Sequence, residues 1–399
     1  MTKLLFLSPI FKKTIWGGDK LETKYGFSCG EGTGECWSVS AHEHGMCVID
    51  KGEYKGKTLK EIWTECPEIF GNEYGKYESE YPLLIKIIDA KEDLSIQVHP
   101  DDGYAKEHAA GSLGKMECWY ILDCEENASI IIGHHAKDTE EMKKMIDQKE
   151  WKEFLREIPI KKGDFFQINP GCLHAIKGGT VILETQQSSD ITYRVYDYDR
   201  LQNGAPRTLH LEDSKAVIKA PFSPSASERK VMKTENVEIE HLIKCSKYSV
   251  ERYAIHGEWR HNFRADFTNV TVTEGNGIID GEAIKKGDSF IVPKGCGALQ
   301  LSGDFEIICS WAESGKQERQ AGYCITVEDW LGRKKAQIKN EEQGILAFQD
   351  IYEEGDIIRF EVPEENKFYK VRVDDTMDEE LVYLTQKEII YDIPFAEKK

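Results

Sequence analysis

The sequence has no long apolar run, and nowhere approaches the ~18 consecutive apolar residues of a membrane-spanning helix. It is also short of positive charge: 52 lysines and arginines stand against 71 acidic residues, for a net charge of −19 over 399 residues. Nucleic acids and anionic membranes bind basic surfaces, so this balance argues against both as partners. An anionic substrate would need a local basic pocket.

The eleven cysteines lack a regular pattern. Their number is odd and their spacings form no disulfide framework, which is typical of proteins from a reducing compartment. The first residues, MTKLLFLSPIFKK, resemble a signal peptide only briefly, because Pro9 interrupts a short apolar run and no small-residue cleavage site follows. We therefore expect a soluble cytoplasmic protein, with its oligomeric state left open by the sequence.

One segment of the chain occurs twice. IKKGDFFQINPGCLHAI, which begins at Ile160, returns as IKKGDSFIVPKGCGALQ, which begins at Ile284, and eight of the first thirteen positions are identical. His174 of the first copy aligns with Ala298 of the second. We interpret the repeat as a structural unit of a duplicated β-domain, in which only the first copy keeps the polar group.

Short β-like segments recur about every ten residues from Leu83 onward and are separated mostly by Gly, Asp, Asn or Pro. This spacing favours a sandwich or barrel over alternating strands and helices. A helical pattern interrupts them, with apolar residues from Met142 to Ile158 at three- and four-residue intervals after an N-cap at Asp138. A second, shorter helix is predicted around residues 59–63.

Linker composition at residues 220–230 divides the chain. A first β-rich block at residues 1–225 precedes it, and a second at 231–315 follows it. The tail, 323–399, shows strand-like alternation near Tyr369 and again in LVYLTQKEIIYDI. We predict a small β-rich module there, without visible chemistry.

Three candidate metal ligands lie on predicted strands. Gln97 and His99 are two residues apart and therefore share one face of a strand, opposite Ile96 and Val98. Lys115 and Glu117 share a face in the same way, and His174 follows a glycine turn. Two imidazoles and a carboxylate on adjacent strands can bind one divalent metal, and glutamine can add a weaker fourth ligand.

Basic residues near these ligands suit a small phosphorylated substrate, because Arg binds phosphate bidentately and Lys binds it as a point charge. Lys115 is adjacent to a proposed ligand. Lys86 either extends along a sheet edge or points into the site. Arg194 either contacts substrate or forms a surface ion pair with Asp190 or Asp197. His42 and His44 are weaker candidates, and His134–His135 is predicted to lie in a loop.

Five blocks of sequence together resemble the type I mannose-6-phosphate isomerases of the short bacterial kind. They are GECWSVSAH, PLLIKIIDAKEDLSIQVHPDD, GKMECWYIL, PGCLHAI and ITYRVYDYDR, in that order along residues 1–315. The resemblance implies a mainly β fold with two cupin-type, jelly-roll β-barrels. It makes residues 1–225 a catalytic cupin domain with a small helical insert and residues 231–315 a metal-free one; the tail lies outside the family pattern.

The resemblance also implies the activity, interconversion of mannose 6-phosphate and fructose 6-phosphate through an enediol(ate). It places one Zn²⁺ on His99, Glu117 and His174, with Gln97 as fourth ligand. By the same likeness Arg194 is the catalytic arginine, and Lys115 binds substrate or transfers a proton, with Glu184 and a metal-bound water as alternatives for that transfer. We add Lys86 as a substrate-binding candidate.

Two other functions remain open from the sequence. A set of two histidines and one carboxylate in a cupin also suits a non-haem Fe(II) oxygenase. A cupin that binds sugar without turning it over is the other alternative. The basic pair Lys115 and Arg194 argues against the oxygenase, and the complete ligand set argues against the binding protein.

Overall fold

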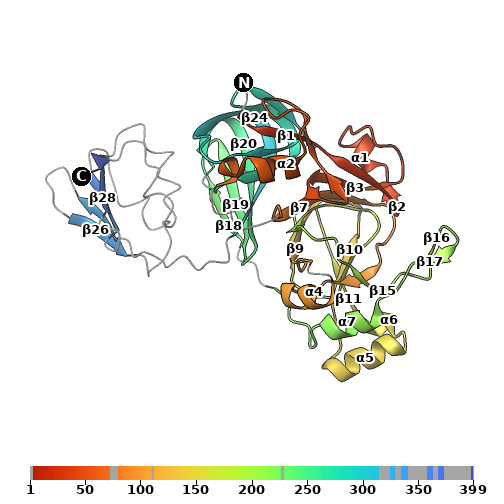
Figure 1. Cartoon of the computed structure of the whole chain (residues 1–399). Coiled ribbons are helices and arrows are strands. Elements are labelled where there is room, and N and C mark those ends of the chain that lie inside the picture. The colour runs from red at the N-terminus through yellow and green to blue at the C-terminus, as the bar shows by residue number, and fades with distance from the viewer. Residues whose placement is uncertain are drawn as a thin grey trace. The chain divides into compact units, whose positions relative to one another are not determined.

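The computed structural model describes residues 3–71, 80–109, 112–225, 229–263 and 265–313, and the backbone of five strands between 324 and 398. The chain forms two compact units, Met1–Ser314 and Gly315–Lys399. The first unit consists mostly of β-strands (Figure 1), as the sequence predicts.

Two antiparallel sheets of the first unit carry the candidate site residues. The five-stranded sheet has the order β11 (Leu155–Pro159), β10 (Ser129–His134), β13 (His174–Ile176), β8 (Ile96–Val98), β15 (Tyr193–Tyr196). The six-stranded sheet has the order β12 (Phe165–Ile168), β9 (Glu117–Cys124), β14 (Thr180–Gln187), β7 (Leu83–Ala90), β2 (Ile10–Gly18), β3 (Thr33–Val39). Within the described residues these sheets are open ones, which is the double-sheet form of a jelly roll.

A nine-stranded sheet contains the second β-rich block. Its order is β18 (Lys230–Lys233), β19 (Val237–Lys244), β20 (Tyr248–Asn262), β24 (Ala298–Ala312), β21 (Thr268–Ile279), β23 (Ser289–Val292), β1 (Leu5–Ser8), β6 (Val48–Ile49), with β22 (Glu282–Lys285) beside β21. Because β1 pairs with β23, the two predicted cupin domains share a sheet. Their division at residues 225 and 231 stays a prediction. Short pairs are β4 (Ala41–His42) with β5 (Gly45–Met46), and β16 (Leu201–Gln202) with β17 (Ala205–Pro206).

The predicted helices are confirmed in part. The helices are α1 (Lys20–Thr23), α2 (Leu59–Glu65), η1 (Pro67–Phe70), α4 (Asp102–His108), α5 (Thr139–Asp147), α6 (Trp151–Phe154) and α7 (Leu211–Val217). Asp138 caps α5 by accepting a hydrogen bond from the backbone N–H of Glu141 at 2.8 Å. The helix predicted to reach Ile158 is wrong at its C-terminal end. A left-handed residue, Lys149, follows α5 (φ 55°), and from Leu155 the chain instead forms β11. No described helix is long and apolar enough to cross a membrane.

The two copies of the repeat form the same turn. In each copy the aspartate, Asp164 or Asp288, accepts a hydrogen bond from the backbone N–H three residues earlier at 2.9 Å. The glycine before it, Gly163 or Gly287, has a φ of 88° or 94°, which glycine adopts without steric cost. The prediction of a structural unit used twice is confirmed.

The tail contains a separate antiparallel sheet. Its order is β26 (Lys334–Lys339), β25 (Cys324–Glu328), β27 (Ile357–Val362), β28 (Lys367–Arg372), β29 (Glu397–Lys398). Strand β28 covers the segment around Tyr369 where alternation predicts a strand. The segment LVYLTQKEIIYDI lies outside the described residues.

The five-stranded sheet is buried on both faces. Its outer face packs against α5, α6 and α7 through a core cluster that includes Ile96, Val98, Met142, Ile146, Phe154 and Val195. Its inner face turns toward the six-stranded sheet across a second cluster that includes Ile88, Trp119, Ile121, Ile132, Ile176 and Ile182. Since Ile96 and Val98 point outward, Gln97 between them points inward, as predicted.

Candidate active site

The inner face of the six-stranded sheet changes from apolar to polar along its strands. On β14, Ile182 belongs to the apolar cluster, and Glu184 and Gln186 follow on the same face. On β9, Glu117 lies at the polar end, where it pairs with Gln186, and Ile121 follows in the apolar cluster. Strand pairing therefore gathers buried polar side chains at one end of an apolar layer.

A row of three polar residues crosses the opposite sheet. His174 on β13 pairs with Gln97 on β8, and Gln97 pairs in turn with Arg194 on β15. Directly paired residues project from the same face of a sheet. All three side chains therefore point inward, and segments far apart in sequence meet at one place.

His99, Glu117 and His174 converge in the buried space between the sheets. The Nε2 atoms of His99 and His174 lie 3.2 Å apart, and each is 3.3 Å from an oxygen of Glu117. All three side chains are at most 1% exposed. One ligand atom from each lies within 4.8 Å of the other two, so the trio could hold a metal ion.

The hydrogen bonds of the trio fit a cation. Nδ1 of His174 donates to the carbonyl oxygen of Cys172 at 2.8 Å, which leaves a lone pair on Nε2, the atom that faces Glu117. Neither buried carboxylate oxygen of Glu117 accepts a hydrogen bond of good geometry in the described structure. The ammonium of Lys115, 2.8 Å from Oε2, balances the buried charge, and a divalent ion would supply the contacts that the two oxygens still lack.

The electrostatics keep the trio in its ligating form. Burial, and next the charge of Lys115, lower the pKa of His99 to about 3. Burial also lowers the pKa of His174. For Glu117, burial opposes ionisation, but Lys115 and the two histidines outweigh it and hold the pKa of the carboxyl well below its usual range. Neutral imidazoles and a carboxylate are the protonation states that bind a metal.

Two further predicted residues surround the trio. The Nζ atom of Lys115 lies 2.8 Å from Glu117 Oε2 and 3.1 Å from His99 Nε2. The Nε2 atom of Gln97 lies 3.4 Å from His174 Nε2. Rotation of this amide by 180° would present its oxygen instead, the atom that a metal ligand requires. Each pair predicted to share a strand face is thus found together.

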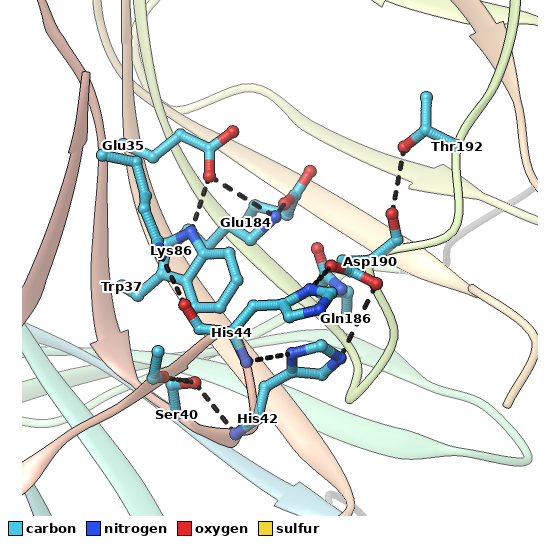
Figure 2. Close-up of polar contacts among 12 residues, drawn as sticks. Glu35, Trp37, Ser40, His42, His44, Lys86, Glu184, Gln186, Asp190 and Thr192 are labelled. Carbon is cyan, nitrogen blue, oxygen red and sulfur yellow. Dashed lines mark hydrogen bonds and ion pairs between the residues drawn. The ribbon is translucent and has the colours of Figure 1, made fainter. Parts of the chain in front are cut away.

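Glu184 and Lys86 form a second buried pair (Figure 2). Lys86 Nζ lies 3.3 Å from Glu184 Oε2 and 3.9 Å from Glu35 Oε2. Its side chain is 7% exposed, so it does not extend along a sheet edge. Trp119 donates from Nε1 to the other oxygen of Glu184 at 3.1 Å. Burial and the nearby Glu117 raise the pKa of Glu184, whereas Lys86 opposes this rise.

Arg194 is only partly bound by the protein. One guanidinium nitrogen, Nη1, donates to the carbonyl oxygen of Thr208 at 2.9 Å. Its Nε is buried and has no hydrogen-bond partner among the described residues. Asp197, one of the two ion-pair partners considered for it, instead accepts hydrogen bonds from Arg200 and Arg207. Donors of Arg194 are therefore available on the inner face.

Comparison with known proteins gives this geometry a family. The family model described as phosphomannose isomerase type I, catalytic domain, matches residues 4–126, and that described as mannose-6-phosphate isomerase, cupin domain, matches residues 238–312.

The mannose-6-phosphate isomerase ManA of Bacillus subtilis is 44% identical over 318 residues, which cover 77% of this chain and 99% of ManA. That of Streptococcus mutans is 42% identical over 316 residues, 78% of this chain and 98% of the relative. A crystal structure of a mannose 6-phosphate isomerase from Bacillus subtilis, 43% identical, aligns with a TM-score of 0.76 over 78% of this chain and 100% of that chain.

The chain belongs to the type I mannose-6-phosphate isomerases. It is therefore an aldose–ketose isomerase with a cupin fold, of a family whose substrates are small sugar phosphates. Metal dependence is typical of this family, and the buried trio supplies a matching ligand set. The alignments include 98–99% of each relative but only 77–78% of this chain. The remaining part of this chain therefore has no counterpart in these relatives.

His42, His44 and Asp190 form a second cluster in this isomerase (Figure 2). The imidazoles of His42 and His44 both contact the carboxylate of Asp190. The backbone N–H of His44 donates to Nδ1 of His42 at 3.2 Å, so the neutral ring carries its proton on Nε2, which faces Asp190. A metal ligand needs a lone pair at that atom, so the cluster fits hydrogen bonding better than metal binding.

Two histidine contacts were not predicted. Asp190 entered the sequence analysis only as an ion-pair partner for Arg194, because nothing in its spacing links it to His42 and His44. The assignment of His134 to a loop is wrong. This residue is the last one of β10, and its Nε2 donates a hydrogen bond to the carbonyl oxygen of Lys219 at 3.0 Å. The β-like run that begins at Ala128 could have indicated this placement.

The burial of His99 predicts a pH-dependent stability of the metal-free isomerase. Its pKa is about 3 when folded, against an ordinary value of 6.5. Below pH 6.5 the unfolded chain therefore binds a proton that the folded chain does not, and stability falls as pH falls. This residue alone contributes a loss of about 1.4 kcal/mol per pH unit. Urea unfolding in the presence of a chelator should show a smaller loss between about pH 6 and pH 5 for His99→Gln. Equal losses of unfolding free energy in the wild-type chain and in His99→Gln would contradict the assignment of this pH dependence to His99.

Proposed function

We propose that this protein interconverts mannose 6-phosphate and fructose 6-phosphate with one Zn²⁺ held by His99, Glu117 and His174. The observation that carries the proposal is the buried trio whose ligand atoms lie within 4.8 Å of one another. Gln97, 3.4 Å from His174, is the proposed fourth ligand. Nitrogen and carboxylate ligands in this number suit Zn²⁺ and leave room for substrate oxygens. Elemental analysis of the purified protein would identify the metal.

The isomerisation moves a proton between C2 and C1 of the opened sugar, and negative charge develops on the carbonyl oxygen. When bound, a divalent ion stabilises such charge as a Lewis acid. We assign proton transfer to Glu184, because burial and Glu117 raise its pKa toward the working pH of an enzyme. Trp119 and Lys86 fix one oxygen each. Lys115, beside His99 and Glu117, is the alternative for this step and a candidate contact for substrate.

We assign Arg194 to stabilising the enediolate. It pairs directly with Gln97, which places it beside the proposed ligands, and its Nε has no partner in the described structure. A preorganised guanidinium stabilises developing negative charge strongly where water is excluded. Lys86 stays a candidate for substrate binding, although its ammonium group already lies near Glu35 and Glu184. A cytoplasmic location stays a prediction from the cysteine pattern.

A coupled assay for fructose 6-phosphate formed from mannose 6-phosphate tests the proposal. We expect turnover that a chelator removes and added Zn²⁺ restores. Oxygen uptake with Fe(II), in the absence of isomerisation, would instead indicate an oxygenase. Sugar phosphate binding without turnover, in the presence of metal, would favour a binding protein.

Removal of the tail is expected to leave turnover within about threefold of the full chain. The chain divides after Ser314 into two compact units. The relatives align over 98–99% of their own length to only 77–78% of this chain, so these members of the family lack the additional segment. A chain ending at Ser314 should therefore fold and retain its kcat, since domains that have their own core fold independently. Circular dichroism and the coupled assay would check this. Loss of the folded state on truncation would show that the tail belongs to the catalytic unit.

A further inference from the structure

The backbone immediately before Glu117 is held by three consecutive hydrogen bonds. The N–H of Gly114 donates to Asp102 Oδ1 at 2.8 Å. The N–H of Lys115 donates to the carbonyl oxygen of Pro100 at 3.0 Å. The N–H of Met116 donates to Gln187 Oε1 at 3.0 Å. This segment carries Lys115, whose ammonium group lies beside both His99 and Glu117, so these bonds fix the backbone from which that side chain extends.

Asp102 and Gln187 form the centre of this arrangement. The Nε2 atom of Gln187 donates to Asp102 Oδ1 at 3.0 Å, so one carboxylate oxygen serves both Gln187 and Gly114. Although burial opposes it, hydrogen bonds from Lys247, Gln187 and Gly114 lower the pKa of Asp102. Asp102 is therefore ionised at neutral pH, and its second oxygen faces a positively charged side chain.

That partner comes from the segment matched as the cupin domain. Lys247 lies in the turn between β19 and β20, and its Nζ lies 2.5 Å from Asp102 Oδ2. The turn is anchored by its neighbour Tyr248, which is fully buried and donates to Gln167 Oε1 on β12 at 3.1 Å. The lysine is 35% exposed and its partner 41%, so the pair is half-buried and held from both sides.

We propose that Lys247 is a positioning residue for the metal site, through Asp102 and the backbone of residues 114–116. The second β-rich block, residues 231–315, has no histidine at the position of His174. Through Lys247 it nevertheless contributes one positive charge that helps to position the metal ligands of the first block, residues 1–225. This inference rests on the proposed isomerase function. It assigns Lys247 no contact with substrate, only the placement of Lys115 and, through it, of Glu117 and His99.

Replacement of Lys247 by Met removes the charge and keeps most of the side-chain volume. Residues that hydrogen-bond directly to metal ligands change metal affinity or activity about 10-fold to 100-fold when mutated. Lys247 acts on the ligands only through a half-exposed ion pair, and such a pair contributes at most about fivefold. We expect K247M to weaken Zn²⁺ binding about threefold to fivefold in a chelator competition and to lower kcat by a similar factor, with KM changed less than about twofold. Amide hydrogen exchange at residues 114–116 should accelerate. The matched control is K244M. The side chain of Lys244 is 59% exposed, and its ammonium lies 3.8 Å from Glu313, so this variant should change none of these quantities.

Two more variants separate positioning from general stabilisation. K247R should have the metal affinity and kcat of the wild-type chain, because arginine keeps the positive charge that Lys247→Met removes. D102N keeps the Oδ1 acceptor but removes the ion pair, so it should act like K247M, and the double variant should be no worse than either single one. Unchanged metal affinity in both K247M and D102N, or effects that add in the double variant, would overturn the inference. The metal titration requires no turnover, so its result stands even if the wild-type chain fails to isomerise mannose 6-phosphate.

Discussion

Replacement of Glu117 by Gln is expected to abolish tight metal binding and to lower kcat about 10³-fold or more. The amide has nearly the same shape but no charge, so two imidazoles and a neutral oxygen would remain for the ion, with Lys115 left 2.8 Å away and without its carboxylate. Lewis-acid stabilisation contributes several kcal/mol, and each 1.36 kcal/mol is a factor of ten in rate. Elemental analysis after desalting and the coupled assay measure the two effects.

The control for this variant is Glu31→Gln, which removes a carboxylate that is 76% exposed. It should retain both the metal and the activity of the wild-type chain. Full metal content together with wild-type kcat in Glu117→Gln would show that the trio is not the metal site. A loss of activity with the metal retained would move Glu117 from ligand to another role in catalysis.

Strand alternation made much of the site predictable. Residues two apart on a strand share a face whatever the strand pairs with, so Gln97 with His99 and Lys115 with Glu117 could be placed from the sequence. Alignment of the two copies of the repeat, which places Ala298 opposite His174, indicated which copy keeps its polar groups. The shared turn at Asp164 and Asp288 confirms the repeat itself.

Strand order and long-range pairing could not be predicted in the same way. The row from His174 through Gln97 to Arg194 exists because β8 lies between β13 and β15, which no local pattern encodes. Lys86 shows the same limit. An isolated lysine in an apolar run is compatible with a sheet edge, and only the pairing of Glu184 opposite it explains its burial.

The helix predicted through Ile158 failed for a related reason. Apolar spacing of three and four residues favours a helix locally, but Ile158 pairs with Ile130 on β10. Pairing with an existing strand overrides local spacing of this kind. The same dependence on distant segments hid the contact between Lys247 and Asp102, which are 145 residues apart.

Replacement of Arg194 by Ala is expected to lower kcat about 10²-fold, because removal of one donor to a developing oxyanion typically costs that much or more. The loss should be similar for mannose 6-phosphate and for unphosphorylated mannose at high concentration, since an enediolate forms on both. KM for the phosphorylated sugar should change little. Metal content should also stay unchanged, because the guanidinium of Arg194 donates to the carbonyl oxygen of Thr208 and not to an atom of the trio.

Arg194→Lys and Arg260→Ala complete the experiment. The lysine keeps a positive charge but loses the planar arrangement of donors, so it should recover only part of the lost kcat. Arg260 is exposed on β20 and serves as the matched surface control. A loss confined to mannose 6-phosphate, with a raised KM, would assign Arg194 to the phosphate group instead. The charge on the enediolate would then have to be stabilised by the metal and by Lys115, whose ammonium lies 3.1 Å from His99.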